Sequence, residues 1–134
     1  MSLELEKNQL EILLECKGDI KNIQEYINDL KKLKEKIDKN RDFINILKVN
    51  KVLSDKNRLL ILGMLLEQEE MCICEFSIAL NLTQPTISHH LKKLEDAGLI
   101  EGEKSGKFVH YRIVKSRIKD YIDLLSNFIK IPID

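Results

Sequence analysis

Long hydrophobic runs are missing from this chain of 134 residues. Its longest apolar run, residues 59–66, is much shorter than the about 20 residues that a membrane-spanning helix needs. Met1 is followed by acidic residues instead of the basic and apolar regions of a signal peptide. We therefore expect a cytoplasmic protein that has no membrane partner.

The sequence also has few cysteines and no net charge. Three cysteines, an odd number, argue against a secreted scaffold built on disulfides. The 22 basic and 22 acidic residues cancel, which is a mild argument against DNA binding, because phosphate neutralisation supplies much of that affinity. The distribution of charge points the other way, since residues 86–119 hold eight basic and four acidic side chains.

Signatures of catalysis are absent as well. The sequence has no Gly-rich phosphate loop, no carboxylate pair in the context of a pocket and no Ser/His/Asp set. We therefore expect a protein that is not an enzyme and requires no cofactor. Its length allows one domain with a modest core plus an extension.

A helix with clear start and stop signals is predicted within residues 82–100, LTQPTISHHLKKLEDAGLI. Thr83 can cap this helix, Pro85 suits its first turn, and Gly98 is a typical C-terminal stop. Apolar side chains recur at helical spacing on one face, at Ile87, Leu91 and Leu94. The other face carries short hydrogen-bonding side chains with lysines behind them, which suits base edges and phosphates in a major groove. On periodicity alone, a plain amphipathic surface helix is the alternative.

The flanking segments favour a winged helix-turn-helix. Residues 72–80 have a short helical pattern, and Asn81-Leu82 is a tight turn before the next helix. Downstream, residues 99–103 and 107–113 predict two strands joined by a turn at 104–106. A basic hairpin directly after a DNA-reading helix is typical of a wing.

These motifs resemble the winged-helix repressors of the ArsR/SmtB family, which respond to arsenic and metals. The resemblance covers residues 48–113 and is carried in order by LSDKNRLLILGML, MCICEF, LTQPTISHHLKKLEDAGLI and GKFVHYRI. It implies a homodimeric transcriptional repressor that binds double-stranded operator DNA and releases it when an inducer binds.

The expected DNA-contacting side chains come from the recognition helix and the wing. They are Thr83, Gln84, Thr86, Ser88, His89, Lys92, Lys104, Lys107 and Arg112. His90 lies beside the apolar stripe, so we expect its side chain to be half-buried. His110 is placed on the wing, either against phosphate or in solvent.

Cys72 and Cys74 are the residues that most clearly indicate a chemical function. In the family that this chain resembles, the segment matching MCICEF supplies thiolate ligands for arsenite or another soft metal ion, which acts as the inducer. In a regular helix two cysteines at this spacing point about 200° apart, so joint binding needs an irregular helix start. The alternatives are a redox-responsive thiol pair, or two inert, buried side chains in a winged-helix, coiled-coil module that binds a protein partner.

The sequence departs from the family's metal sites at several positions. Ser77 stands where arsenic-type sites often have a third cysteine. Cys16 is the only candidate for the thiols that cadmium- and lead-type sensors take from an extension. Residues 115–134 hold no histidine, which argues against the family's Asp/His zinc site on the last helix. The resemblance therefore implies a site of Cys72 and Cys74, with Cys16 either as the third thiol or as a packed residue of its helix.

Further helices are predicted on either side of the motifs. Residues 41–53 form the first helix of the domain, and residues 55–66 form the second, with Ser54 as its N-cap. Residues 115–130 carry an apolar stripe that fits a last helix closing the dimer.

An N-terminal extension completes the chain. Residues 2–17 and 19–39 are predicted helices separated by Gly18-Asp19, and the second has the apolar spacing of a coiled coil. The extension either packs on its own domain or braces a dimer. The expected fold class is all-α with a small β-hairpin wing: a winged helix-turn-helix domain of residues 41–134 preceded by a helical extension of residues 1–40.

Overall fold

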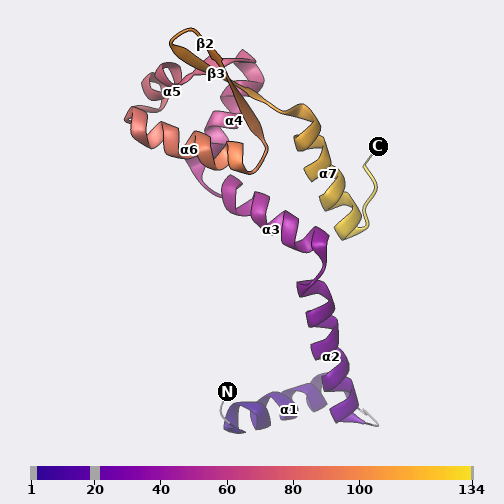
Figure 1. Cartoon of the computed structure of the whole chain (residues 1–134). Coiled ribbons are helices and arrows are strands. Elements are labelled where there is room, and N and C mark those ends of the chain that lie inside the picture. Colours follow the sequence, from indigo (N-terminus) through magenta and orange to yellow (C-terminus); the bar gives the residue numbers. More distant parts are fainter. Residues whose placement is uncertain (1–2, 19–21, 134) are drawn as a thin grey trace. The chain divides into compact units, whose positions relative to one another are not determined.

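The computed structural model describes residues 3–18 and 22–133, and these fall into two compact units, one within residues 1–40 and one within 41–134 (Figure 1). The first unit contains α1 (Leu3–Lys17) and α2 (Ile23–Asp38). Ser2, Asp19 and Ile20, which we expected in these helices, lie outside the described residues. The side chain of Asn22 caps α2 by accepting a hydrogen bond from the Glu25 N–H at 3.1 Å.

Helix α2 has an amphipathic pattern but buries no side chain in the described part of the chain. Leu30, Leu33 and Ile37 are 41%, 53% and 39% exposed. Ion pairs along the helix, such as Lys34–Asp38 at 2.7 Å, are exposed and add little stability. The helix therefore carries an apolar stripe that its own unit does not cover.

The second unit is mainly helical with a small sheet. Its elements in chain order are α3 (Arg41–Leu53), α4 (Lys56–Gln68), β1 (Met71–Cys72), α5 (Ile73–Leu80), α6 (Gln84–Asp96), β2 (Ile100–Ser105), β3 (Phe108–Ile113) and α7 (Lys115–Ile129). Helices α5 and α6 are the two helices of a helix-turn-helix, and β2 and β3 form the wing (Figure 1). The predicted fold class is confirmed. Among the described residues no helix is long and apolar enough to span a membrane.

One core lies beneath α6. Its fully buried side chains are Ile61, Leu65, Phe76, Ile87, Leu91, Leu94, Leu99 and Ile100. They come from α4, α5, α6 and the start of the wing. Burying each such side chain stabilises the fold by about 1.5–3 kcal/mol, so the apolar stripe of α6 fixes which of its faces points outward.

The turn between α5 and α6 follows the sequence signals. Asn81 adopts φ 53° in the left-handed region, where Asn is tolerated, and ends α5. Thr83 then caps α6, as its side chain accepts a hydrogen bond from the Thr86 N–H. Gly98, with φ 76°, follows the end of α6. These local signals set the angle and length of the recognition helix.

The start of α4 corrects one prediction. Asp55, and not Ser54, is the N-cap: its Oδ1 accepts from the N–H groups of Asn57 and Arg58 at 2.9 and 3.2 Å. The Ser54 hydroxyl instead donates to the Lys51 carbonyl at 2.9 Å. A carboxylate is the stronger acceptor at a helix N-terminus, so the aspartate takes the cap and the serine closes α3.

The sheet has three strands in the order β1-β3-β2, where we expected a hairpin alone. The added strand β1 pairs Met71 with Tyr111 and Cys72 with His110. The wing turn is also later and shorter than the predicted residues 104–106. Ser105 pairs with Phe108, which leaves only Gly106 and Lys107 in the turn. Gly106 has φ 64°, which a tight two-residue hairpin turn requires at its first position.

At Gly102 the backbone of β2 lies close to side chains of β3. A Cβ placed there would lie 2.8 Å from Cγ1 of Val109 and 2.9 Å from a ring carbon of Tyr111. Glycine therefore lets β2 lie against the side chains of β3.

Candidate nucleic-acid interface

The outer face of α6 presents the side chains expected to contact DNA. Thr83, Gln84, Thr86, Ser88, His89 and Lys92 are all exposed. Two of them also serve the helix itself, since the hydroxyls of Thr83 and Thr86 lie 2.8 Å apart at the cap. Lys92 lies 3.5 Å from Asp96, an exposed pair that phosphate can readily replace. The face is short, polar and open, as a major-groove helix requires.

The wing divides the expected phosphate contacts into two kinds. Lys104 and Lys107 are exposed near its tip. Arg112 is half-buried, and its guanidinium pairs with Glu103 at 2.5 Å. We therefore expect the two lysines, rather than Arg112, to supply the wing's direct phosphate contacts.

The three histidines occupy different environments. His89 is exposed on α6, whereas His90 is only 8% exposed and faces α4. Their ring centroids lie 6.0 Å apart. His110 on β3 lies with Nδ1 at 3.4 Å from Oε1 of Glu70, so a carboxylate partners it on the side away from the wing tip. Only His89 combines exposure with a place on the recognition face.

Cys72 and Cys74 lie on either side of a helix start. Cys72 is the last residue of β1 and the N-cap of α5, with extended backbone at φ −101° and ψ 167°. Cys74 lies in the first turn of α5, and both thiols are free and half-buried. Because Cys72 lies outside the regular helix, the opposed directions expected of two helical cysteines do not apply.

Glu75 fixes this helix start, and sequence analysis missed it. Its Oε1 accepts a hydrogen bond from the Cys72 N–H at 3.0 Å. An acidic residue three positions after an N-cap is a known capping arrangement, so the spacing could have revealed it. The capping carboxylate thus places a negative charge at the backbone of Cys72.

Cys74 touches the recognition helix. Nε2 of Gln84, the first residue of α6, donates to Sγ of Cys74 at 3.8 Å. The candidate sensor and the DNA-contacting face therefore meet at one hydrogen bond. No pattern in the sequence announces this contact, because the two residues belong to different helices.

The other possible ligands do not gather around this pair. Ser77, which replaces the family's third cysteine, donates its hydroxyl to the Leu82 carbonyl and closes the turn. Cys16 is exposed on α1, in the N-terminal unit. In the part of the chain that the structure describes, no three His, Cys, Asp or Glu side chains converge on a point that could hold a metal ion.

Comparisons with known proteins point to one family. The arsR family of bacterial regulatory proteins matches residues 55–102. An HTH-type transcriptional regulator of Methanocaldococcus jannaschii is 44% identical over 69 residues, which are 52% of this chain and 78% of that protein. The arsenical resistance operon repressor of Escherichia coli is 46% identical over 56 residues, 42% of this chain but only 48% of the repressor.

A solved structure agrees with the fold. The homodimeric winged helix-turn-helix DNA-binding domain of a possible ArsR-family regulator from Mycobacterium bovis has a TM-score of 0.53 and 25% identity, covering 63% of this chain and 81% of that one. The matched shares of 52%, 42% and 63% leave a large part of this chain outside each comparison.

Proposed function

Because this chain belongs to the ArsR family of bacterial transcriptional regulators, we propose that it is a dimeric repressor whose operator DNA is released by a soft metal or metalloid ion at Cys72 and Cys74. The observation that carries the proposal is the hydrogen bond between Cys74 and Gln84. It joins the thiol pair directly to the helix that contacts DNA.

Dimerisation is supported by helices α3 and α7. They pack together, with the rings of Phe43 and Phe128 5.9 Å apart. Outside this contact both helices leave large apolar side chains exposed, at Ile44, Leu47, Ile122 and Ile129. A second copy would cover that face, and the M. bovis neighbour is itself a homodimeric winged helix-turn-helix domain. Two recognition helices would then enter major grooves about one helical turn apart on a roughly palindromic site.

The chemistry of the thiols supports an inducer of the arsenite type. Thiolates are the soft ligands that such ions select, and an E. coli relative is an arsenical resistance operon repressor. Cys72 and Cys74 would hold the ion. An ion held by both sulfurs would draw Sγ of Cys74 toward Cys72 and change its contact with Gln84, which would disturb the start of α6.

A thiol-redox switch is the second candidate, because both cysteines are free and half-buried. Oxidation would remove the same hydrogen bond without any metal. A winged-helix module with inert cysteines that binds a protein partner is the third.

Release from DNA separates these candidates. An operator is first selected from random duplexes, and its release by arsenite, cadmium, zinc and peroxide is measured by fluorescence anisotropy. The wild type should release the operator with arsenite or cadmium, whereas Cys72→Ser and Cys74→Ser should bind it equally well and fail to release it. Cys16→Ser should respond partially if Cys16 supplies a third thiolate, and like the wild type if Cys16 is only a packed side chain.

Each alternative has its own outcome. Release by peroxide alone, reversed by a thiol reductant, would replace metal sensing with redox sensing. A Cys72→Ser, Cys74→Ser double variant that still releases DNA with arsenite would remove the sensor. Failure to select any operator, with monomers in sedimentation at micromolar concentration, would overturn the repressor itself.

A further inference from the structure

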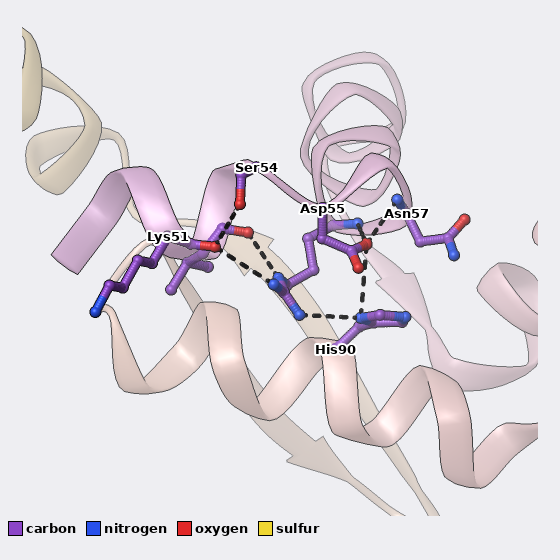
Figure 2. A network of polar contacts seen from close by, with 7 residues as sticks. Lys51, Ser54, Asp55, Asn57 and His90 are labelled. Atoms are coloured by element: carbon purple, nitrogen blue, oxygen red, sulfur yellow. Dashed lines mark hydrogen bonds and ion pairs between the residues drawn. The ribbon is translucent and has the colours of Figure 1, made fainter. Parts of the chain in front are cut away.

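A buried histidine faces inward from the DNA-reading helix. His90 follows the exposed His89 on α6 but is only 8% exposed. It meets α4 at two polar groups: a guanidinium nitrogen of Arg58 lies 3.4 Å from its Nδ1, and Oδ1 of Asp55 lies 3.9 Å from the same atom (Figure 2). A polar ring at this depth needs a partner, and the choice of partner depends on its proton.

The closer of the two contacts, with Arg58, requires one protonation state of the His90 ring. An arginine side chain only donates hydrogen bonds, so Nδ1 of His90 must accept and the ring must be neutral, with its hydrogen on Nε2. The carboxylate of Asp55, at 3.9 Å, is too distant for a hydrogen bond but within reach of an ion pair with a protonated ring. Protonation therefore replaces one partner by the other.

Arg58 carries this contact to a third helix. Its Nε donates to the Val52 carbonyl at 2.6 Å, and a terminal nitrogen lies 3.5 Å from the Lys51 carbonyl. These carbonyls belong to the last turn of α3, where helix carbonyls have no partner within the helix. Arg58 thus ties the end of α3, the start of α4 and the buried side of α6 together.

Asp55 completes the arrangement without competing for the neutral ring. Its pKa is lowered, chiefly because the backbone N–H of Arg58 donates to it; burial opposes this effect, while the N–H of Asn57 and the charge of Arg58 add to it. It stays ionised as the cap of α4 while His90 changes its charge. The charged or titratable groups near His90 are Arg58 and Asp55 from α4 and its cap, and His89 on its own helix. In the described contacts α3 contributes only backbone carbonyls.

We propose that His90 is a positioning residue for operator recognition: its neutral ring, held by Arg58, sets α6 against the end of α3. This inference rests on the proposed function, because α3 is the proposed dimer helix and operator binding is the readout. The dimer fixes α3, so the bracket Lys51/Val52–Arg58–His90 fixes the two recognition helices relative to each other. Affinity for operator DNA depends on the spacing of the two recognition helices, whereas affinity for random DNA does not.

Protonation of the His90 ring removes the bracket. Histidine is the side chain whose charge changes between about pH 5 and 8. A proton on Nδ1 cannot coexist with a donated hydrogen bond from Arg58, and it turns the ring toward Asp55. Operator affinity falls as a result, while affinity for random DNA stays the same or rises with the added positive charge.

The test compares operator and random-DNA affinities of the full chain at about pH 8 and about pH 5.5, at constant ionic strength. The wild type should lose about tenfold in the operator-to-random ratio, the size expected for one charge-assisted hydrogen bond. His90→Asn places an amide oxygen near the position of Nδ1 and cannot titrate, so it should keep the ratio at both pH values. Arg58→Lys should lower the ratio at both.

His110→Asn is the matched control, because it removes a histidine that lies on β3 beside Glu70 instead of on α6, and it should leave the pH step intact. Circular dichroism at each pH checks that every variant is folded. A pH step in His90→Asn equal to that of the wild type would overturn the proposal, as would a wild type without any step.

A measurement without DNA separates this inference from the proposed function. Long-range proton–nitrogen NMR of the histidine rings at about pH 8 should show His90 with its hydrogen on Nε2. A hydrogen on Nδ1 would overturn the bracket even in a confirmed repressor. If His90 shows the expected tautomer but the protein selects no operator, the proposed repressor function is wrong and the contact between His90 and Arg58 stands.

Discussion

The amide of Gln84 donates to the sulfur of Cys74 across 3.8 Å, so the first residue of the recognition helix contacts the thiol pair one helix earlier. Sulfur is a weak acceptor, and this contact adds little stability. Its importance lies in its position, since the same amide faces the major groove in the proposed complex. One side chain can therefore be held by the thiol or by a base, and an ion on the thiol changes that balance.

Replacing Gln84 should affect binding and induction together. Gln84→Met has a similar length but no donor, so we expect about 1–3 kcal/mol weaker operator binding if the amide contacts a base. We also expect a smaller ratio of affinities with and without arsenite. Ser88→Ala is the control, because it removes a DNA contact far from the thiols and should weaken binding with the induction ratio unchanged. Equal induction ratios in both variants would argue against coupling through Gln84.

The recognition helix and the wing should differ in what they recognise. Ser88→Ala and His89→Ala are expected to weaken operator binding more than random-DNA binding, because they remove contacts to base edges. Lys107→Ala should weaken both and reduce the slope of log affinity against log salt by about one unit. Anisotropy titrations at several salt concentrations measure both quantities. Equal effects of all three substitutions on both DNAs would show that this division is wrong.

The cap of α4 should control stability in a pH-dependent way. Asp55→Ala should lower the free energy of unfolding by about 1 kcal/mol, and Ser54→Ala by less. Because the folded-state pKa of Asp55 is lowered, its contribution is present above the unfolded pKa and is lost as pH falls through the folded value. The difference between wild type and Asp55→Asn should therefore be constant at neutral pH and change only below about pH 4. Urea unfolding at each pH measures it.

Two glycines should respond to alanine in opposite directions. Gly102→Ala puts a Cβ within 3 Å of Val109 and Tyr111, and the overpacking should cost about 1–3 kcal/mol. Gly63→Ala, in the middle of α4, meets open space and should stabilise the protein by about 0.5–1 kcal/mol. Thermal unfolding of both variants gives the comparison. A neutral Gly102→Ala would mean that the wing relaxes without strain.

Local signals were enough to predict the helix-turn-helix. The Thr83 cap, the turn at Asn81 and the apolar stripe ending at Leu94 act within a few residues of one another, so the sequence displays them directly. The same reasoning failed at Ser54, because two adjacent residues could both cap and only the folded chain shows that Asp55 does.

Features that depend on distant residues were missed. The two residues of β1 are a strand only because β3 lies beside them, and so short a segment has no periodicity of its own. The contact between Arg58 and His90 joins residues 32 positions apart. Composition and spacing carry no record of such a pair.

The short strand β1 also has a mechanical consequence. Met71 and Cys72 pair with Tyr111 and His110 of β3, so one end of the cysteine segment is anchored to the wing. The other end leads into α5, whose eight residues pack on α6. If the two thiols are drawn together, Cys72 is held by its pairing with β3. The movement therefore falls on Cys74 and the start of α5, where Gln84 of α6 makes contact.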